Sequence, residues 1–390
     1  MAERTRRSRT PRTTPNPVGR RRAQVTAASA AGIGIAGAAA SAALLHRACT
    51  DDHGVPTAGP YGIRADETLT VVAEDGVNLH VEIDEPEPGA TDAARVDGEV
   101  PTVVLAHGYT LDLTSWAFQR ADLAAAGYRV VTYDQRGHGL SGESDRERCT
   151  IDQLGRDLRS VVDHVAPTGP LVLVGHSMGG MSVESFAGQF PEVVAERVVA
   201  VGLVATSAGG MGLVTIGLGK VFDSAFLRLG PGVMAGLHRR QRLFGGLRRI
   251  GRDVEYSAVA HYGFGRSATP DMIRYTADMI MGTPLRTTAS FLPHLDDLDV
   301  REALAHLQEV EVLVLNGSRD RLTPPGHSDD IVRLVPHARH VVVPGAGHII
   351  TFEAADVVNR QLRALIERGA RRAQDRPRSG RPSDRRGTAR

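Results

Sequence analysis

Residues 171–180 read Leu-Val-Leu-Val-Gly-His-Ser-Met-Gly-Gly, and this stretch decides the fold. Four consecutive apolar residues indicate a buried strand, and the stretch from Met178 to Gln189 is typical of a helix. Ser177 therefore stands at the apex of a sharp turn between the strand and the helix. Glycines at 175 and 179 let the two elements pass closely, so that Ser177 adopts a positive φ. This arrangement is typical of an exposed serine nucleophile.

The partners that such a serine needs follow later in the chain. A histidine must take the hydroxyl proton, and a carboxylate must orient that histidine. After a strand–serine–helix turn these partners come in the order serine, acid, histidine, each in a loop after a later strand. Asp320 follows a predicted strand at 310–316, and His348 follows another at 340–343. We therefore predict a triad of Ser177, Asp320 and His348.

Other residues compete for these roles. Asp134 ends a predicted strand at 129–133 and is the alternative acid, but we expect it to close its own turn through backbone N–H groups. His176 and His138 lie inside the motifs, and we interpret both as structural. Glu353, just past His348, is interpreted as the beginning of the last helix.

An oxyanion hole needs two backbone N–H donors, one from the residue after the nucleophile and one from the loop after an early strand. Met178 is the first predicted donor. The apolar run from Thr102 to Ala106 predicts the early strand, and it ends in His107-Gly108-Tyr109. Gly108 permits a close approach, so the N–H of Tyr109 is the second predicted donor.

Predictions for a substrate pocket rest on weaker signals. Trp116 fits either the wall of an acyl pocket or an anchor of the first core helix, and the sequence leaves both open. The further candidates for lining the pocket are His107, Gly108, Met211 and Phe291.

From about Leu69 to Glu367 the chain resembles the α/β-hydrolase superfamily, in the branch of serine esterases, lipases and cofactor-free haloperoxidase-like enzymes. Four motifs carry the resemblance: His107-Gly108-Tyr109, residues 134–141 (Asp-Gln-Arg-Gly-His-Gly-Leu-Ser), the Ser177 turn, and the Asp320 and His348 loops. Relatives that act as epoxide hydrolases or dehalogenases use aspartate at the turn, so Ser177 counts against those two reactions. The resemblance implies a helical cap inserted after the sixth strand.

The order of elements predicts the same architecture, an α/β fold. A hairpin at 69–83 precedes strands that alternate with helices, which is typical of a mostly parallel, doubly wound sheet. The alternation breaks after Thr206, where about a hundred residues have helical patterning. The predicted organisation is a basic disordered N-terminus (1–24), a hydrophobic signal or anchor segment (25–45), the first part of the core (60–206), a helical cap (207–309), the second part of the core (310–367) and a basic disordered tail (368–390).

Composition excludes several other classes of protein. The first 22 residues and residues 368–390 each carry a net charge of +7, and because the whole chain carries +1, the part between them carries −13. An acidic body with two short basic ends is not typical of a nucleic-acid-binding domain. No cluster of histidine and cysteine predicts a metal, and no dinucleotide or phosphate-binding glycine motif predicts a cofactor.

Residues 25–45 form a run of 21 residues without a charge, directly after Arg20-Arg21-Arg22. The length fits a membrane span, although alanine dominates the composition. A signal anchor, a cleaved export signal and a cytosolic leader all fit the pattern. The arginine block favours an enzyme domain that is membrane-anchored or secreted, with a cytoplasmic location as the alternative.

These observations predict a serine hydrolase of small-molecule or lipid-like carboxylic esters that acts through an acyl-enzyme. One alternative keeps the triad but changes the reaction, to a cofactor-free perhydrolase, a haloperoxidase-like enzyme or a lyase. The other is a ligand-binding, receptor-like protein of the same fold.

Overall fold

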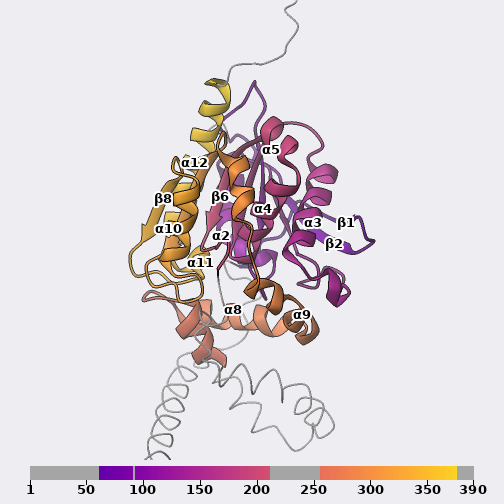
Figure 1. Ribbon diagram of the computed structural model, residues 1–390. Coiled ribbons are helices and arrows are strands. Elements are labelled where there is room, and N and C mark those ends of the chain that lie inside the picture. The colour runs from indigo at the N-terminus through magenta and orange to yellow at the C-terminus, as the bar shows by residue number, and fades with distance from the viewer. Residues whose placement is uncertain (1–60, 91–92, 211–254, 376–390) are drawn as a thin grey trace, which may run out of the picture.

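The computed structural model describes residues 61–90, 93–210 and 255–375 of the chain (Figure 1). Within these residues an eight-stranded sheet forms the centre of the molecule, with the strand order β1-β2-β4-β3-β5-β6-β7-β8. The strands are β1 (Glu67–Val72), β2 (Asn78–Asp84), β3 (Thr102–Ala106), β4 (Val130–Tyr133), β5 (Leu171–His176), β6 (Val198–Val204), β7 (Glu311–Gly317) and β8 (Arg339–Val343). β2 pairs antiparallel with β1 and β4, and the pairs from β4 to β8 are parallel. The predicted mostly parallel α/β sheet is therefore confirmed.

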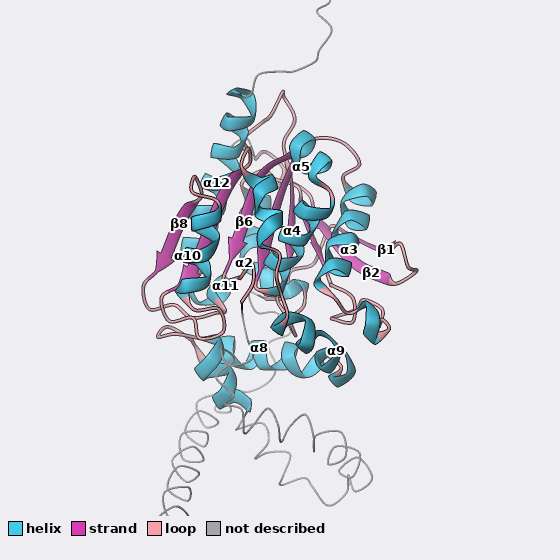
Figure 2. Ribbon diagram, viewed as in Figure 1, coloured by secondary structure: helices cyan, strands magenta, loops and turns pink. Residues whose placement is uncertain are grey.

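Helices cover both faces of this sheet (Figure 2). The α-helices of the core are α2 (Ala117–Ala125), α3 (Ile151–Val165), α4 (Met178–Gln189), α5 (Pro191–Arg197), α10 (Pro325–Leu334), α11 (Ile350–Glu353) and α12 (Ala355–Asp375). Three short 3₁₀ helices add to them: η1 (Leu113–Trp116), η2 (Arg146–Arg148) and η5 (Arg301–Leu307). The Asp112 side chain accepts the N–H of Thr114 and so caps the start of η1, which leads directly into α2.

Alternate residues of each strand enter two apolar layers, because successive side chains of a strand point to opposite faces. Leu171 and Leu173 of β5 pack in a cluster with residues of α3, α4 and α10. Val172 and Val174 pack in a second cluster with residues of α2 and α12. Burial on both faces explains why these strands read as continuous apolar runs in the sequence.

Two buried arginines hold the opening hairpin to the rest of the core. Arg136, whose side chain is fully buried, donates to Asp157 on α3 at 2.6 Å and to Asp75 in the β1–β2 turn at 2.8 Å. Arg120 on α2 donates to Asp84 and Glu82 of β2, each at 2.7 Å. Loss of one partner would leave an uncompensated buried charge, which costs about 3–5 kcal/mol in comparable cases.

Between β6 and β7 the described residues form helices joined by short loops. Residues 255–263 form a helix, and α8 (Pro270–Gly282) and α9 (Leu285–Asp296) follow it. Figure 1 shows α8 and α9 at one end of the sheet, and hydrogen bonds described below join them to the loop after β3. Residues 211–254 of the predicted cap (207–309) lie outside the described residues, so the cap stays a prediction.

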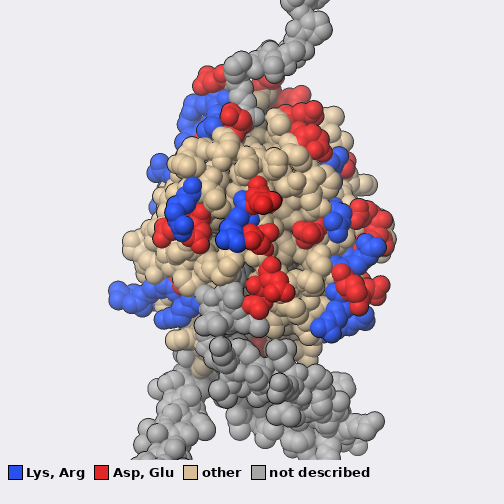
Figure 3. Space-filling view, in the orientation of Figure 1, with Lys and Arg blue, Asp and Glu red and all other residues tan. Residues whose placement is uncertain are grey.

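Charged side chains of both signs are interspersed on the face drawn in Figure 3. Among the described residues, no helix has both the length and the apolar character that crossing a bilayer requires. The predicted segment at 25–45 lies outside the described residues.

Candidate active site

Ser177 lies between the end of β5 and the start of α4, with φ of 53° and ψ of −121°. This is a sparsely populated backbone conformation, which persists only when its surroundings hold it. The Ser177 N–H donates to the Val204 carbonyl on the neighbouring strand at 2.9 Å. The close contacts explain the glycines, since a Cβ on Gly175 would lie 2.2 Å from the Gly179 carbonyl oxygen. A Cβ on Gly179 would lie 2.1 Å from the carbonyl oxygen of Ala106.

Asp320 and His348 meet after β7 and β8. Oδ2 of Asp320 lies 2.8 Å from Nδ1 of His348, and each residue is 4% exposed. The N–H groups of Leu322 and Thr323 donate to Oδ1 of the same carboxylate at 2.9 Å, and the Thr323 hydroxyl donates to Oδ2. Because a carboxylate only accepts hydrogen bonds, Nδ1 of His348 carries the proton and Nε2 is left to act as a base.

His348 also lies beside the serine turn. The ring of His176 is 4.9 Å from that of His348, and its Nε2 donates to the His348 carbonyl at 2.9 Å. Burial, with a smaller contribution from His348, lowers the pKa of His176 to about 3. Among the described residues, no hydrogen bond joins the Ser177 hydroxyl to His348 Nε2, and such contacts commonly tighten only when substrate binds.

Gly108 brings the β3 loop (residues 107–112) against the serine turn. A Cβ on Gly108 would lie 3.2 Å from Cβ of Ser177 and 2.9 Å from Nδ1 of His176. Within the described part of the chain, neither the N–H of Tyr109 nor that of Met178 has a hydrogen-bond acceptor. Met178 is the first residue of α4, so its N–H has no partner inside the helix and is available to an anionic oxygen.

His107 joins the β3 loop to the loop after β4. Its Nδ1 donates to the Gly108 carbonyl at 2.8 Å, and its Nε2 accepts the N–H of Gln135 at 2.9 Å. Burial is the main cause that lowers the pKa of His107 to about 4. The side chain is fully buried and both nitrogens are used within the protein, so it connects two loops in this structure instead of facing an open pocket.

The remaining predicted pocket residues are dispersed. Trp116 is fully buried in the core cluster beside α2 and α12, which favours its interpretation as a core anchor. Phe291 of α9 is also fully buried, in a cluster that contains Met178. Met211 lies outside the described residues.

Asp134 accepts the N–H groups of Leu113 and Leu140, each at 2.8 Å. Burial is the main cause that raises the pKa of Asp134 to about 6. Its carboxylate thus closes its own turn and also holds the start of η1, directly after the β3 loop. No hydrogen bond between Asp134 and His348 occurs among the residues that the structure describes.

Glu353 has a role that the sequence did not reveal. Its Oε2 accepts the N–H groups of Gly347 at 2.7 Å and Gly265 at 2.8 Å, and its Oε1 accepts that of Ser267 at 2.8 Å. The carboxylate therefore ties the loop of His348 to the segment that precedes α8. Only its position five residues after His348 could have drawn attention to it.

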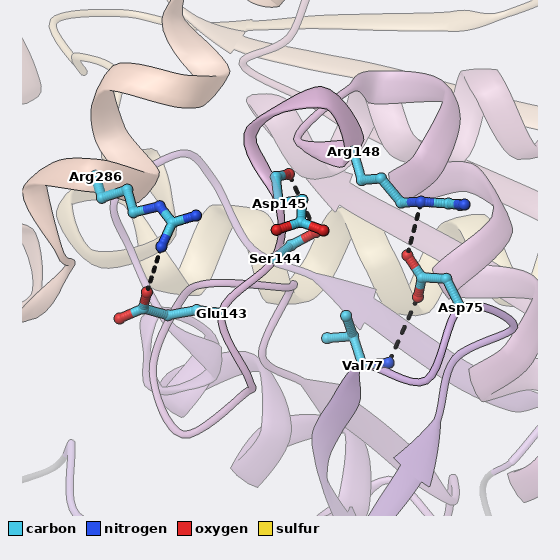
Figure 4. A pocket seen from close by; sticks show the side chains of 7 residues that line it. All are labelled: Asp75, Val77, Glu143, Ser144, Asp145, Arg148 and Arg286. Carbon is cyan, nitrogen blue, oxygen red and sulfur yellow. Dashed lines mark hydrogen bonds and ion pairs between the residues drawn. The ribbon is translucent and has the colours of Figure 1, made fainter.

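A separate cavity of about 230 Å³ lies away from the serine turn (Figure 4). Its charged residues pair with one another or with buried neighbours: Arg148 lies 3.7 Å from Asp75, and Arg286 lies 3.9 Å from Glu143. The cavity is lined by Asp75, Val77, Glu143, Ser144, Asp145, Arg148 and Arg286. None of these is a predicted site residue. In the described ranges no cluster of three or more acidic, histidine or cysteine residues has the arrangement of a metal site.

Comparisons with known proteins show the family to which this fold belongs. The family model for the alpha/beta hydrolase fold matches residues 101–355. A dihydrolipoyllysine-residue acetyltransferase component of the acetoin cleaving system from Pseudomonas putida is 28% identical over 280 residues, which cover 70% of this chain but only 65% of that protein. The bifunctional esterase/perhydrolase DCH from Acinetobacter calcoaceticus is 26% identical over 278 residues, covering 69% of this chain and 92% of the relative.

Among solved structures, a thermophilic esterase from Thermogutta terrifontis superimposes with a TM-score of 0.59 at 23% identity. The match covers 78% of this chain and 99% of the esterase. At this identity the likeness concerns the fold.

Proposed function

This chain belongs to the alpha/beta hydrolase fold family, and from that premise we propose that it is a serine hydrolase that cleaves carboxylic esters through an acyl-enzyme. The observation that carries the proposal is the 2.8 Å hydrogen bond from His348 to Asp320, beside a serine held at positive φ. Relatives and fold neighbours that include an esterase/perhydrolase and an esterase support the same class of reaction.

In the proposed reaction the Ser177 hydroxyl attacks the ester carbonyl while Nε2 of His348 takes its proton. Asp320 keeps the proton on Nδ1 and stabilises the imidazolium that forms. The N–H groups of Tyr109 and Met178 stabilise the negative oxygen of the tetrahedral intermediate. The carbon–oxygen bond to the alcohol then breaks, and His348 returns the proton to the leaving alcohol.

Water completes the cycle. His348 takes a proton from a water molecule, the oxygen of that water attacks the acyl carbon, and the bond to Ser177 breaks as His348 returns the proton to the serine oxygen. The products are a carboxylic acid, an alcohol and the free enzyme.

A fluorophosphonate probe tests the nucleophile. The full chain should be labelled, and Ser177→Ala should lose both the label and ester turnover, by about 10⁴-fold or more in kcat. Ser207→Ala is the matched control, because the Ser207 hydroxyl is also buried and lies 2.9 Å from Nδ1 of His327. Labelling that persists in Ser177→Ala, or that disappears in Ser207→Ala, would refute the assignment.

The second candidate function is perhydrolysis, favoured by the relative that is a bifunctional esterase/perhydrolase. Here hydrogen peroxide replaces water as the attacking molecule, so that the acyl group leaves as a peracid and Ser177 regains its proton from His348. Parallel assays of p-nitrophenyl esters and of acetate with peroxide separate the two reactions, and an ester panel with increasing acyl length defines the substrate. Tight ligand binding that is unchanged in Ser177→Ala, without turnover of any ester, would instead support a receptor-like protein.

We further propose that residues 25–45 bring the enzyme domain to or across a membrane. Three arginines directly before 21 uncharged residues support an N-terminus that stays inside. Fractionation of cells that express the full chain, against a chain lacking residues 1–45, should find the full chain in the membrane or export fraction. Equal recovery of both chains in the cytosol would contradict the proposal.

A further inference from the structure

Two hydrogen bonds join the β3 loop to the helices inserted between β6 and β7. The Tyr109 hydroxyl donates to the Thr288 carbonyl of α9 at 2.6 Å. The hydroxyl of Thr283, which follows α8, donates to the Thr110 carbonyl at 3.1 Å. Two neighbouring residues of the loop that carries the proposed oxyanion donor are thus held by elements outside the α/β core.

The backbone of this loop needs such support. Thr110 has φ of 60°, in the left-handed region that a β-branched residue rarely adopts. A conformation of this kind persists only where surrounding contacts over-determine it. The hydrogen bond from Thr283 reaches Thr110 itself, and the one from Tyr109 holds the residue directly before it.

Side-chain packing extends the same connection to the second proposed donor. Tyr109 packs against an apolar cluster that contains Met178 from the start of α4 and Phe291 from α9. The two residues whose N–H groups would stabilise the oxyanion are therefore anchored in one cluster, and α9 supplies a fully buried ring to it. The side chain of Tyr109 is half-buried, and its hydroxyl finds its acceptor in the Thr288 carbonyl.

We propose that Tyr109 is a positioning residue. The hydrogen bond from its hydroxyl to α9 directs the backbone N–H of Tyr109 toward the oxyanion. This inference rests on the proposed esterase function. The oxyanion forms only in the transition state, so a misdirected donor slows the chemical step without weakening substrate binding. Tyr109→Phe should therefore lower kcat while leaving KM nearly unchanged.

The test compares kcat and KM for one short ester among wild type, Tyr109→Phe, Thr283→Val and the double variant. Removal of a complete oxyanion donor costs about 10²- to 10³-fold, so loss of its support should lower kcat by about tenfold in Tyr109→Phe. Thr283→Val should lower kcat by a smaller factor, and the double variant should fall below both. KM should stay within about twofold, since only transition-state binding is affected.

Ser290→Ala is the matched control, because Ser290 lies on α9 but its hydroxyl donates to the Arg286 carbonyl of the same helix. Its kcat should equal that of wild type. A Tyr109→Phe variant with wild-type kcat would overturn the inference. A Ser290→Ala control whose kcat and thermal stability change as much as those of Tyr109→Phe would also overturn it. If wild type hydrolyses no ester and binds no fluorophosphonate, the proposed function is refuted. This result differs from failure of the inference about Tyr109, in which wild type is active and Tyr109→Phe has the same kcat.

Discussion

Both sides of the candidate site have close backbone contacts at glycines, such as Gly179 on one side and Gly317 on the other, but they differ in the polar side chains that add to these contacts. On the serine side, the loops after β3, β4 and β5 are fixed by backbone contacts at glycines and by three buried histidines, His107, His138 and His176. Burial lowers the pKa of each of these histidines to about 3 or 4, so they are neutral near pH 7. On the histidine side, the loops after β7 and β8 are fixed by the carboxylates of Asp320 and Glu353, which accept backbone N–H groups.

We expect this difference to make the two sides respond to different kinds of substitution. A contact between backbone atoms leaves no room for an added carbon, so both sides should respond to side-chain volume at their glycines. Bonds to a carboxylate are charge-assisted, so the histidine side should respond to the loss of a charge at constant volume. The predictions below test this contrast.

The largest effect is expected from Gly179→Ala on the serine side. The added Cβ would lie 2.1 Å from the carbonyl oxygen of Ala106, and backbone atoms cannot yield as a side chain does. We expect a loss of about 4 kcal/mol or more in the free energy of unfolding, together with loss of fluorophosphonate labelling. Chemical unfolding and probe labelling measure both.

Gly282→Ala is the control, since a Cβ at that position would have no atom within 4 Å and the backbone requires no positive φ. Its stability should match or slightly exceed that of wild type. Equal stability of the two variants would show that close packing does not fix the serine side.

A smaller effect is expected from Glu353→Gln on the histidine side. The amide keeps the size of the side chain, but its NH₂ group cannot accept the N–H groups that the carboxylate now accepts. We expect the free energy of unfolding to fall by about 2 kcal/mol and kcat to fall by about tenfold, because the loop of His348 loses its support. Steady-state kinetics and urea unfolding test this, with the exposed Glu367→Gln as control. A kcat equal to that of wild type would show that Glu353 does not support the loop of His348.

The smallest effect concerns pH and the neutral histidines. Burial, reinforced by the neighbouring His107, lowers the pKa of His138 to about 3 from an ordinary value of 6.5. The unfolded chain therefore binds a proton that the folded chain excludes, and stability falls as pH drops below about 6.5. Between pH 7.5 and 5.5 this single group should remove about 1 kcal/mol from the stability of wild type.

In His138→Asn that loss should be absent, so the difference in unfolding free energy between wild type and variant should change by about 1 kcal/mol over the same pH interval. Urea unfolding at the two pH values measures this change. A constant difference would mean that His138 takes up its proton in the folded state.

The strands and the core helices could be predicted closely from the sequence. The observed β3 coincides with the predicted strand at 102–106, and α4 with the predicted helix at 178–189. Buried parallel strands are continuous apolar runs, and the turns between them are rich in glycine, so the signal is local. After Thr206 the sequence predicted helical patterning over about a hundred residues, and the structure defines α8 and α9 within that stretch.

The sequence by itself determined the order of strands and helices and the residues of the proposed triad that follow them: Ser177, Asp320 and His348. Only the tertiary structure decided that Glu353 supports the loop of His348 and that the Tyr109 hydroxyl reaches α9. The physical reason is distance along the chain, since Tyr109 and Thr288 are 179 positions apart and Glu353 and Gly265 are 88 apart. Turn chemistry and apolar periodicity act over a few residues, whereas these hydrogen bonds exist only because folded loops meet at the same end of the sheet.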